Sequence, residues 1–271
     1  MGNTFAGSFR PQHGTAVRPF SMEEEYSGSI PLKGYCLEGD SALVDTAGSP
    51  SAHIRLALLL PEDGPGMEGI RDDILKAFFG QTVRENIPDD SLLDVFSNEY
   101  FNKYIEANID IYEGGHSFSW DMIAESDVLM NRSGILVYRA DNYAFTGGAH
   151  GLGVSRFLVF DTGKMQKIEL QDIFIPGYEE PLSQMLENSL RRDYYLEDGQ
   201  PLTAAGLFEE RIAPTVNFFL TENSIGFFYN PYEIAPYAMG GIAITLRPED
   251  VSHLLREGSI PDRLWAGRPA Q

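Results

Sequence analysis

Three strand patterns follow one another after residue 114, and this succession constrains the fold more than any other feature. They cover residues 117–125, 134–140 and 154–161, with only short polar or glycine-containing segments between them. Parallel neighbours need a long crossover connection, usually a helix, so strands joined this closely pair antiparallel. We therefore expect an antiparallel sheet in the middle of the chain.

The preceding part of the chain contains two strand patterns and two helix patterns, at residues 26–34, 52–60, 67–79 and 89–109. In both helix patterns apolar residues recur at the spacing of one helical face, so we expect both helices to cover one face of a sheet. Gly80 is placed to end the first helix. Three residues are placed to cap the second: Asp89, Asp90 and Ser91.

The last third of the chain again mixes helix and strand. Pro181 favours the first turn of a helix, and Pro248 starts a short closing helix. Between them lie a hairpin pattern at residues 215–229 and a period-two strand at residues 241–247. We predict an α+β fold of antiparallel sheets with helices packed on one face, in two intimately packed subdomains.

The expected domain boundaries follow from these patterns. They are a flexible segment at residues 1–25, one α+β domain at residues 26–160, a second at residues 161–257, and a loosely held tail at residues 258–271. The chain has 271 residues, enough for one large domain or two modest ones.

A formal charge of −20 excludes nucleic acid as a partner, because phosphate contacts need clustered lysine and arginine. The charge favours a cationic protein, and simple solubility is the alternative explanation. No apolar run approaches the roughly 18 residues of a membrane span. The single cysteine, Cys36, excludes an internal disulfide framework and a cysteine-based zinc site.

Residues 142–151 contain a Gly-Gly-x-x-Gly run between two strand patterns. We expect glycines 147, 148 and 151 to let two pieces of main chain meet. A second loop, at residues 229–237, carries tyrosines stiffened by prolines, which suits recognition; packing beneath the sheet edge is the alternative. The candidate binding residues of the two loops are Tyr143, Thr146, Gly147, Gly148, His150, Tyr232, Glu233 and Tyr237.

Two further hypotheses concern these loops. Glu233 is the best candidate for an acceptor from the backbone of Gly147 and Gly148. His150 would need a carboxylate and a nucleophile to act as a general base, and the sequence around Ser155 is not a nucleophile elbow. The five histidines show no metal-ligand spacing, although His116 would approach His150 if folding brought them together. We therefore predict no catalytic residue, no metal and no cofactor.

Three segments carry a family resemblance, at residues 143–151, 160–174 and 227–240. Together they resemble the paired domains of unknown function found in the N-terminal region of a peptidoglycan deacetylase and in the extracellular part of a lysozyme-sensing anti-sigma factor. The resemblance spans residues 26–256 and assigns residues 26–160 to the deacetylase-associated type.

The resemblance implies an α+β module outside the cytoplasm, often secreted or lipid-anchored, and a surface that meets basic lysozyme in the anti-sigma relative. We expect this chain to depart from both relatives, because its sequence shows no pattern of a transmembrane helix, a sigma-binding segment or a deacetylase domain. We expect a non-enzymatic extracytoplasmic binding module for a basic protein such as lysozyme, or for peptidoglycan fragments. The alternative is a peptidoglycan hydrolase that uses His150 and a carboxylate.

Overall fold

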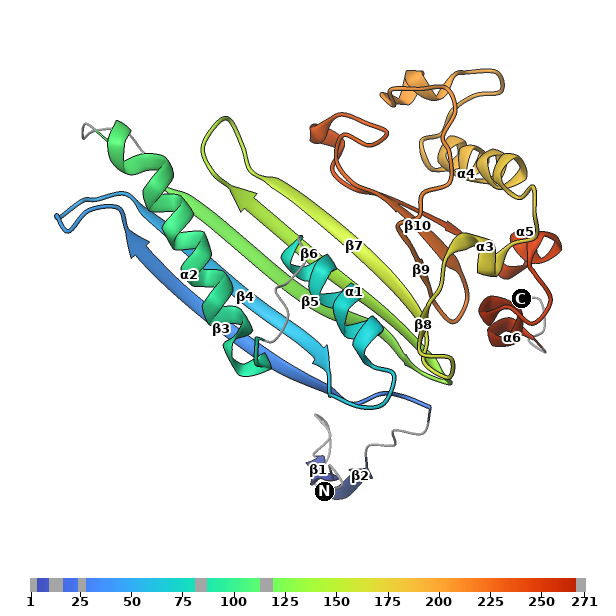
Figure 1. Ribbon diagram of the computed structural model, residues 1–271. Coiled ribbons are helices and arrows are strands. Elements are labelled where there is room, and N and C mark those ends of the chain that lie inside the picture. Colours follow the sequence, from blue (N-terminus) through green and yellow to red (C-terminus); the bar gives the residue numbers. More distant parts are fainter. Residues whose placement is uncertain (1–3, 10–16, 24–27, 81–86, 113–118, 267–271) are drawn as a thin grey trace.

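A six-stranded sheet with two helices on one face forms the N-terminal part of the protein (Figure 1). The computed structural model describes residues 4–9, 17–23, 28–80, 87–112 and 119–266. The strand order is β3-β4-β5-β6-β7-β8. The bounds are β3 Leu32–Ala42, β4 Ser51–Pro61, β5 Trp120–Arg132, β6 Ile135–Phe145, β7 Leu152–Asp161 and β8 Gln166–Lys167.

Both N-terminal helices cover the same face of this sheet, as predicted (Figure 1). They are α1, Glu68–Phe79, and α2, Asp89–Asn108, which continues as the 3₁₀ turn η1, Ile109–Ile111. Gly80 ends α1 in the left-handed conformation, also as predicted. No side chain caps α2, because its N-cap residue is Pro88, which has no side-chain acceptor; the carboxylate of Asp89, the first helical residue, pairs with Arg71.

The β5, β6 and β7 strands pair antiparallel, as predicted, but β4 and β5 pair parallel. The chain between them crosses over through α1 and α2, the long connection that a parallel pair requires. The first strand was predicted at residues 26–34 and lies instead at Leu32–Ala42. Gly39 and Asp40 belong to this strand because an exposed edge tolerates glycine and charge.

The C-terminal part is built around a three-stranded antiparallel sheet in the order β11-β10-β9. Its strands are β9 Phe218–Leu220, β10 Ile225–Tyr229 and β11 Ile242–Leu246. The hairpin and the period-two strand are therefore confirmed. The helices and 3₁₀ turns are α3 Leu170–Ile173, α4 Glu179–Asp193, η2 Leu202–Ala205, η3 Tyr237–Met239, α5 Pro248–Val251, η4 Ser252–Leu254 and α6 Ile260–Trp265.

Two hydrophobic cores lie on opposite faces of the six-stranded sheet. Leu136, Tyr138 and Phe160 face the core beneath α1 and α2. The residues Val137 and Val159 face the C-terminal core, which also contains α4 and the three-stranded sheet. Because alternate residues of β6 and β7 belong to different cores, the two parts share one sheet. The α+β class is confirmed.

The described residues of both terminal segments contain regular elements. In the first segment, Thr4–Phe9 (β1) and Arg18–Glu23 (β2) form an exposed antiparallel pair. The expected loose tail contains α6, whose Trp265 is buried and whose Arg263 pairs with the buried Asp161 at 3.1 Å. Aromatic burial and this ion pair hold α6 against the fold. No helix in the described ranges has the length and apolar character needed to span a bilayer.

The turn after β7 leads into β8 and is closed by a side chain. Asp161 Oδ1 accepts hydrogen bonds from the backbone N–H groups of Gly163 and Lys164. Met165, which follows, has a positive φ of 52°.

Candidate binding site

The first candidate loop joins β6 to β7 and begins at the exposed Thr146. Gly147 and Gly148 have φ of 101° and 95°, a conformation that favours glycine. A Cβ added at either residue would meet nothing within 4 Å. Their role is therefore conformational, and the expected close approach of two main-chain segments does not occur there.

Gly151 is a glycine for a different reason. A Cβ at this position would collide with the ring of Tyr143, which occupies that space. The contact joins the end of β6 to the start of β7, so Tyr143 supports the loop from the side of the sheet. The approach predicted for Gly151 therefore involves a side chain and not a second main chain.

The second candidate loop joins β10 to β11 and is held by hydrogen bonds within itself. The Glu233 carboxylate accepts from the backbone N–H of Asn230 at 2.8 Å, and the Glu233 N–H donates to the Asn230 carbonyl at 3.0 Å. Tyr232 takes a positive φ of 73°. Such a backbone is unusual for a bulky residue and places the Tyr232 side chain at the surface, 52% exposed.

The two loops meet through three aromatic rings. The His150 ring stacks on Tyr237, with centroids 3.9 Å apart and planes 15° apart. Tyr232 lies 5.7 Å from Tyr237, and its hydroxyl is 3.3 Å from His150 Nε2. We call His150, Tyr232 and Tyr237 the aromatic surface. The predicted meeting of the glycine loop with the tyrosine-proline loop is confirmed.

The predicted bond from Glu233 to the glycine loop is not formed. Among the hydrogen bonds of the described residues, Glu233 accepts from Asn230 and not from Gly147 or Gly148. The carboxylate satisfies its own loop because Asn230 is only three residues away, which makes a local turn the easier partner. Glu233 thus shapes the tyrosine-proline loop from within.

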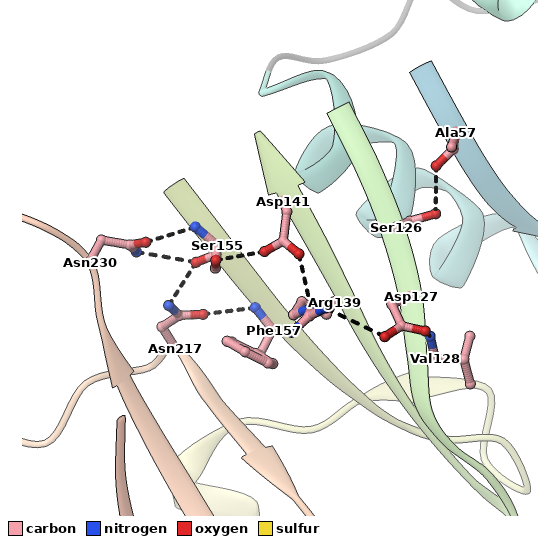
Figure 2. A network of polar contacts seen from close by, with 10 residues as sticks. All are labelled: Ala57, Ser126, Asp127, Val128, Arg139, Asp141, Ser155, Phe157, Asn217 and Asn230. Atoms are coloured by element: carbon pink, nitrogen blue, oxygen red, sulfur yellow. Dashed lines mark hydrogen bonds and ion pairs between the residues drawn. The ribbon is translucent and has the colours of Figure 1, made fainter. Parts of the chain in front are cut away.

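Two asparagines fasten the C-terminal part to the sheet, Asn230 at the start of this loop and Asn217 just before β9, and sequence reasoning missed both (Figure 2). Asn230 accepts from the Ser155 N–H at 2.7 Å and donates to the Ser155 carbonyl at 3.2 Å. Asn217 accepts from the Phe157 N–H at 2.8 Å and also donates to the Ser155 carbonyl, at 2.9 Å. Their side-chain amides replace a neighbouring strand along β7.

Aromatic packing supports the same junction. Phe157 of β7 contacts Phe219 and Phe228, with ring centroids 4.8 and 5.3 Å away. The C-terminal sheet is therefore held beside β7 by both polar and apolar contacts. This is why loops 82 residues apart in sequence meet at His150 and Tyr232.

The surroundings of His150 show hydrogen bonds to neutral groups. Its Nδ1 lies 2.9 Å from the Gly151 carbonyl, and its Nε2 faces the Tyr232 hydroxyl. The Ser155 hydroxyl donates to Asp141 at 2.6 Å, and Asp141 also pairs with Arg139 (Figure 2). In the described residues no carboxylate is hydrogen-bonded to His150, so the geometry does not assemble the acid and base of the hydrolase alternative.

A metal role has no geometric support within the described ranges, where no group of three or more candidate ligands comes together. His116, which was considered as a neighbour of His150, lies outside the described residues. A shallow cavity of about 350 Å³ borders the tyrosine-proline loop and is lined in part by Arg211, Tyr229 and Glu233. Arg211 is already paired with Glu180 and Glu187.

Comparisons with known proteins show what the C-terminal part is similar to. Residues 171–247 match the family model described as a protein of unknown function, DUF3298. The sequence has no match among curated proteins.

Two solved structures share the fold. A DUF3298-family protein of Bacteroides fragilis is 25% identical, with a TM-score of 0.78, covering 89% of this chain and 99% of that one. A DUF3298-family protein of Pseudomonas aeruginosa is 20% identical, with a TM-score of 0.62 and coverages of 89% and 100%. The predicted resemblance to a domain of unknown function is confirmed, and its deacetylase and anti-sigma context stays a prediction. Residues 171–247 thus match the DUF3298 family model, and the fold of the whole chain is similar to solved structures described as members of that family.

Proposed function

We propose that this protein is a non-enzymatic extracytoplasmic binding module that contacts a basic protein through the aromatic surface. The observation that carries the proposal is the stacking of His150 on Tyr237, which joins two distant loops into one exposed patch beside Tyr232. The extracytoplasmic location rests on the resemblance noted from the sequence.

The chemistry of this patch suits a cationic partner. Tyrosine rings attract lysine and arginine side chains over their faces, and Glu233, which is exposed in the same loop, adds a negative charge. Hydrogen bonds from Asn230 and within the loop fix the rings before binding. A preformed aromatic patch loses little entropy when a partner docks.

The charge of the neighbouring sheet face supports the same partner. Strand register places six carboxylates on the face of β3 to β6 opposite the helices, belonging to Glu38, Asp40, Asp121, Glu125, Asp127 and Asp141. Among the described residues of these strands, the basic side chains on that face are His53, Arg55, Arg132 and Arg139. Together with the net charge of −20, this excess steers cationic proteins toward the molecule.

The test is a binding titration with lysozyme as the basic probe, an acidic protein of similar size as the negative control, and soluble peptidoglycan fragments as a separate arm. We expect lysozyme to bind, and the affinity to fall as ionic strength rises. Tyr232→Ala and Tyr237→Ala should each weaken binding at least about tenfold, the scale of an aromatic hot spot. Tyr195→Ala is the matched control, since Tyr195 is 92% exposed and lies outside the aromatic surface.

Three results would contradict the proposal. One is equal binding of lysozyme by the tyrosine variants and the wild type. Another is binding of peptidoglycan fragments without any binding of lysozyme. The third is release of peptidoglycan products that stops in His150→Ala, which would favour the hydrolase alternative.

A further inference from the structure

The two edges of the six-stranded sheet differ in what covers their backbone groups. On one edge, the β7 strand is covered by β8 and by the side-chain amides of Asn217 and Asn230. On the other edge, β3 pairs with β4 alone among the described strands (Figure 1). An unpaired strand edge is a template for another extended segment.

The β3 edge is long and regular. Its register with β4 runs from Leu32 to Ala42 without a shift, so no bulge interrupts its eleven residues. Proline is absent from the strand itself. Two of the usual devices that stop a second strand from pairing, bulges and proline, are therefore missing here, and the strand carries charged side chains instead, at Lys33, Glu38 and Asp40.

The ladder shows which backbone groups face outward. The Leu43 N–H donates to the Pro50 carbonyl, and the Pro31 carbonyl accepts from the Glu62 N–H. Odd-numbered residues of this segment therefore bond to β4, and the even-numbered ones point their N–H and C=O groups away from it. The outward residues are Leu32, Gly34, Cys36, Glu38, Asp40 and Ala42.

The two faces beside this edge differ in chemistry. On the face opposite the helices, Glu38 and Asp40 present carboxylates, both of which approach the single ring of His53. On the helix face, Tyr35 and Leu37 are partly exposed and pack against the core below α2. An added strand would alternate between these two faces residue by residue.

We propose that the β3 edge binds an extended segment of a partner protein in which basic and apolar side chains alternate. The basic side chains pair with Glu38 and Asp40, while the apolar ones cover Leu37 and Tyr35. The backbone of the segment bonds to the outward groups of β3 as an antiparallel seventh strand. This site is separate from the aromatic surface and does not depend on it.

The test uses a fluorescent nine-residue peptide of alternating lysine and valine, measured by anisotropy against the full chain. A peptide of the same composition in lysine and valine blocks is the control for charge alone. Cys36→Pro removes the outward N–H of one β3 residue and leaves every hydrogen bond between β3 and β4 in place. Cys36→Ala, which keeps this N–H, is the matched control. We expect the alternating peptide to bind the wild type and the alanine variant, and the proline variant to bind at least tenfold more weakly.

A second measurement needs no variant of the protein. In an antiparallel pair the residue directly opposite an outward β3 residue points its own N–H toward β3. Lysines opposite Glu38 and Asp40 therefore donate to β3, and the valines do not. Backbone N-methylation of the lysines should abolish binding to the wild type, while methylation of the valines should preserve it.

The proposal would be overturned if methylation of the lysines and methylation of the valines weakened binding equally. It would also be overturned if the block peptide bound as tightly as the alternating peptide. Equal binding by the proline and alanine variants would do the same. A sedimenting dimer of the wild type that the proline variant loses and the alanine variant keeps would assign the edge to a second copy of this chain, and would overturn it too.

Discussion

Asn230 bonds both the backbone N–H and the backbone carbonyl of Ser155, as a neighbouring strand would. One side-chain amide thereby closes part of the β7 edge and anchors the loop that carries Tyr232 and Tyr237. Asn217 accepts from the Phe157 N–H and also donates to the Ser155 carbonyl, which extends this cover along β7. The hydrogen bonds of Asn230 to Ser155 therefore both cover part of the β7 edge and hold the binding loop in place.

Replacing Asn230 with alanine should lower the free energy of unfolding by about 1–3 kcal/mol, because the partly buried Ser155 N–H loses its partner while the Ser155 carbonyl keeps only the bond from Asn217. It should also weaken binding at the aromatic surface. Urea unfolding measures the first effect and lysozyme titration the second. Asn188→Ala is the control, since Asn188 is exposed on α4; an equal loss in both variants would argue against the anchoring role.

The contact between Gly151 and Tyr143 predicts a coupled pair of substitutions. Gly151→Ala should destabilise the protein by about 1–3 kcal/mol, because the new methyl group overlaps the tyrosine ring. In a protein that already carries Tyr143→Ala, the Gly151→Ala substitution should lower the free energy of unfolding only slightly. A double-mutant cycle by urea unfolding measures the coupling, and additive costs would contradict the contact.

Asp73 predicts a change in stability with pH. Burial is the main cause that raises the pKa of its carboxyl above the ordinary 3.8, and Lys167 opposes the rise. A raised pKa means that the folded state holds the proton more tightly than the unfolded state. This group's contribution to stability is therefore lost as pH rises from 3.8 through the folded pKa.

Asp73→Asn should accordingly raise the melting temperature at pH 7 and leave it nearly unchanged below pH 3.8. Thermal unfolding across this pH range measures the difference. Asp72→Asn is the matched control, since the neighbouring Asp72 is exposed. A gain at pH 7 of the same size in both variants would contradict the role of burial.

Tyr138 is fully buried, and its hydroxyl donates to the Leu59 carbonyl at 2.8 Å. Tyr138→Phe should lower the free energy of unfolding by about 1–3 kcal/mol, because it leaves that carbonyl without its partner.

The same residue predicts a change in stability at high pH. Burial raises the pKa of the Tyr138 hydroxyl, so the folded state keeps its proton where the unfolded state loses it. The wild type should therefore lose stability above pH 10, and the phenylalanine variant should lose less over the same range. Parallel pH profiles of the two proteins would contradict this reasoning.

Periodicity predicted the elements whose apolar residues repeat at a fixed spacing. The helix at Glu68–Phe79 and the strand at Ser51–Pro61 are examples, since one face of each is buried. The parallel pairing of β4 with β5 was not predictable in this way, because it depends on which strands meet after the crossover. Likewise, Glu38 and Asp40 on an exposed edge have no alternation with a buried face that would mark a strand.

Part of the candidate site was predictable for a similar reason. The glycines at 147 and 148 and the prolines beside Tyr232 mark unusual backbone geometry within a few residues. The partners of Asn217 and Asn230 are 60 and 75 residues away in sequence. Nothing local distinguishes these asparagines from ordinary turn residues, so their role emerged only with the fold.

The most direct test of the binding surface is chemical-shift mapping on isotope-labelled protein while unlabelled lysozyme is added. We expect the largest chemical-shift changes at His150, Tyr232, Glu233 and Tyr237. In the Tyr237→Ala variant, the two remaining rings of His150 and Tyr232 should no longer shift together. Shift changes spread over the whole acidic surface, with none concentrated in these two loops, would contradict a defined site.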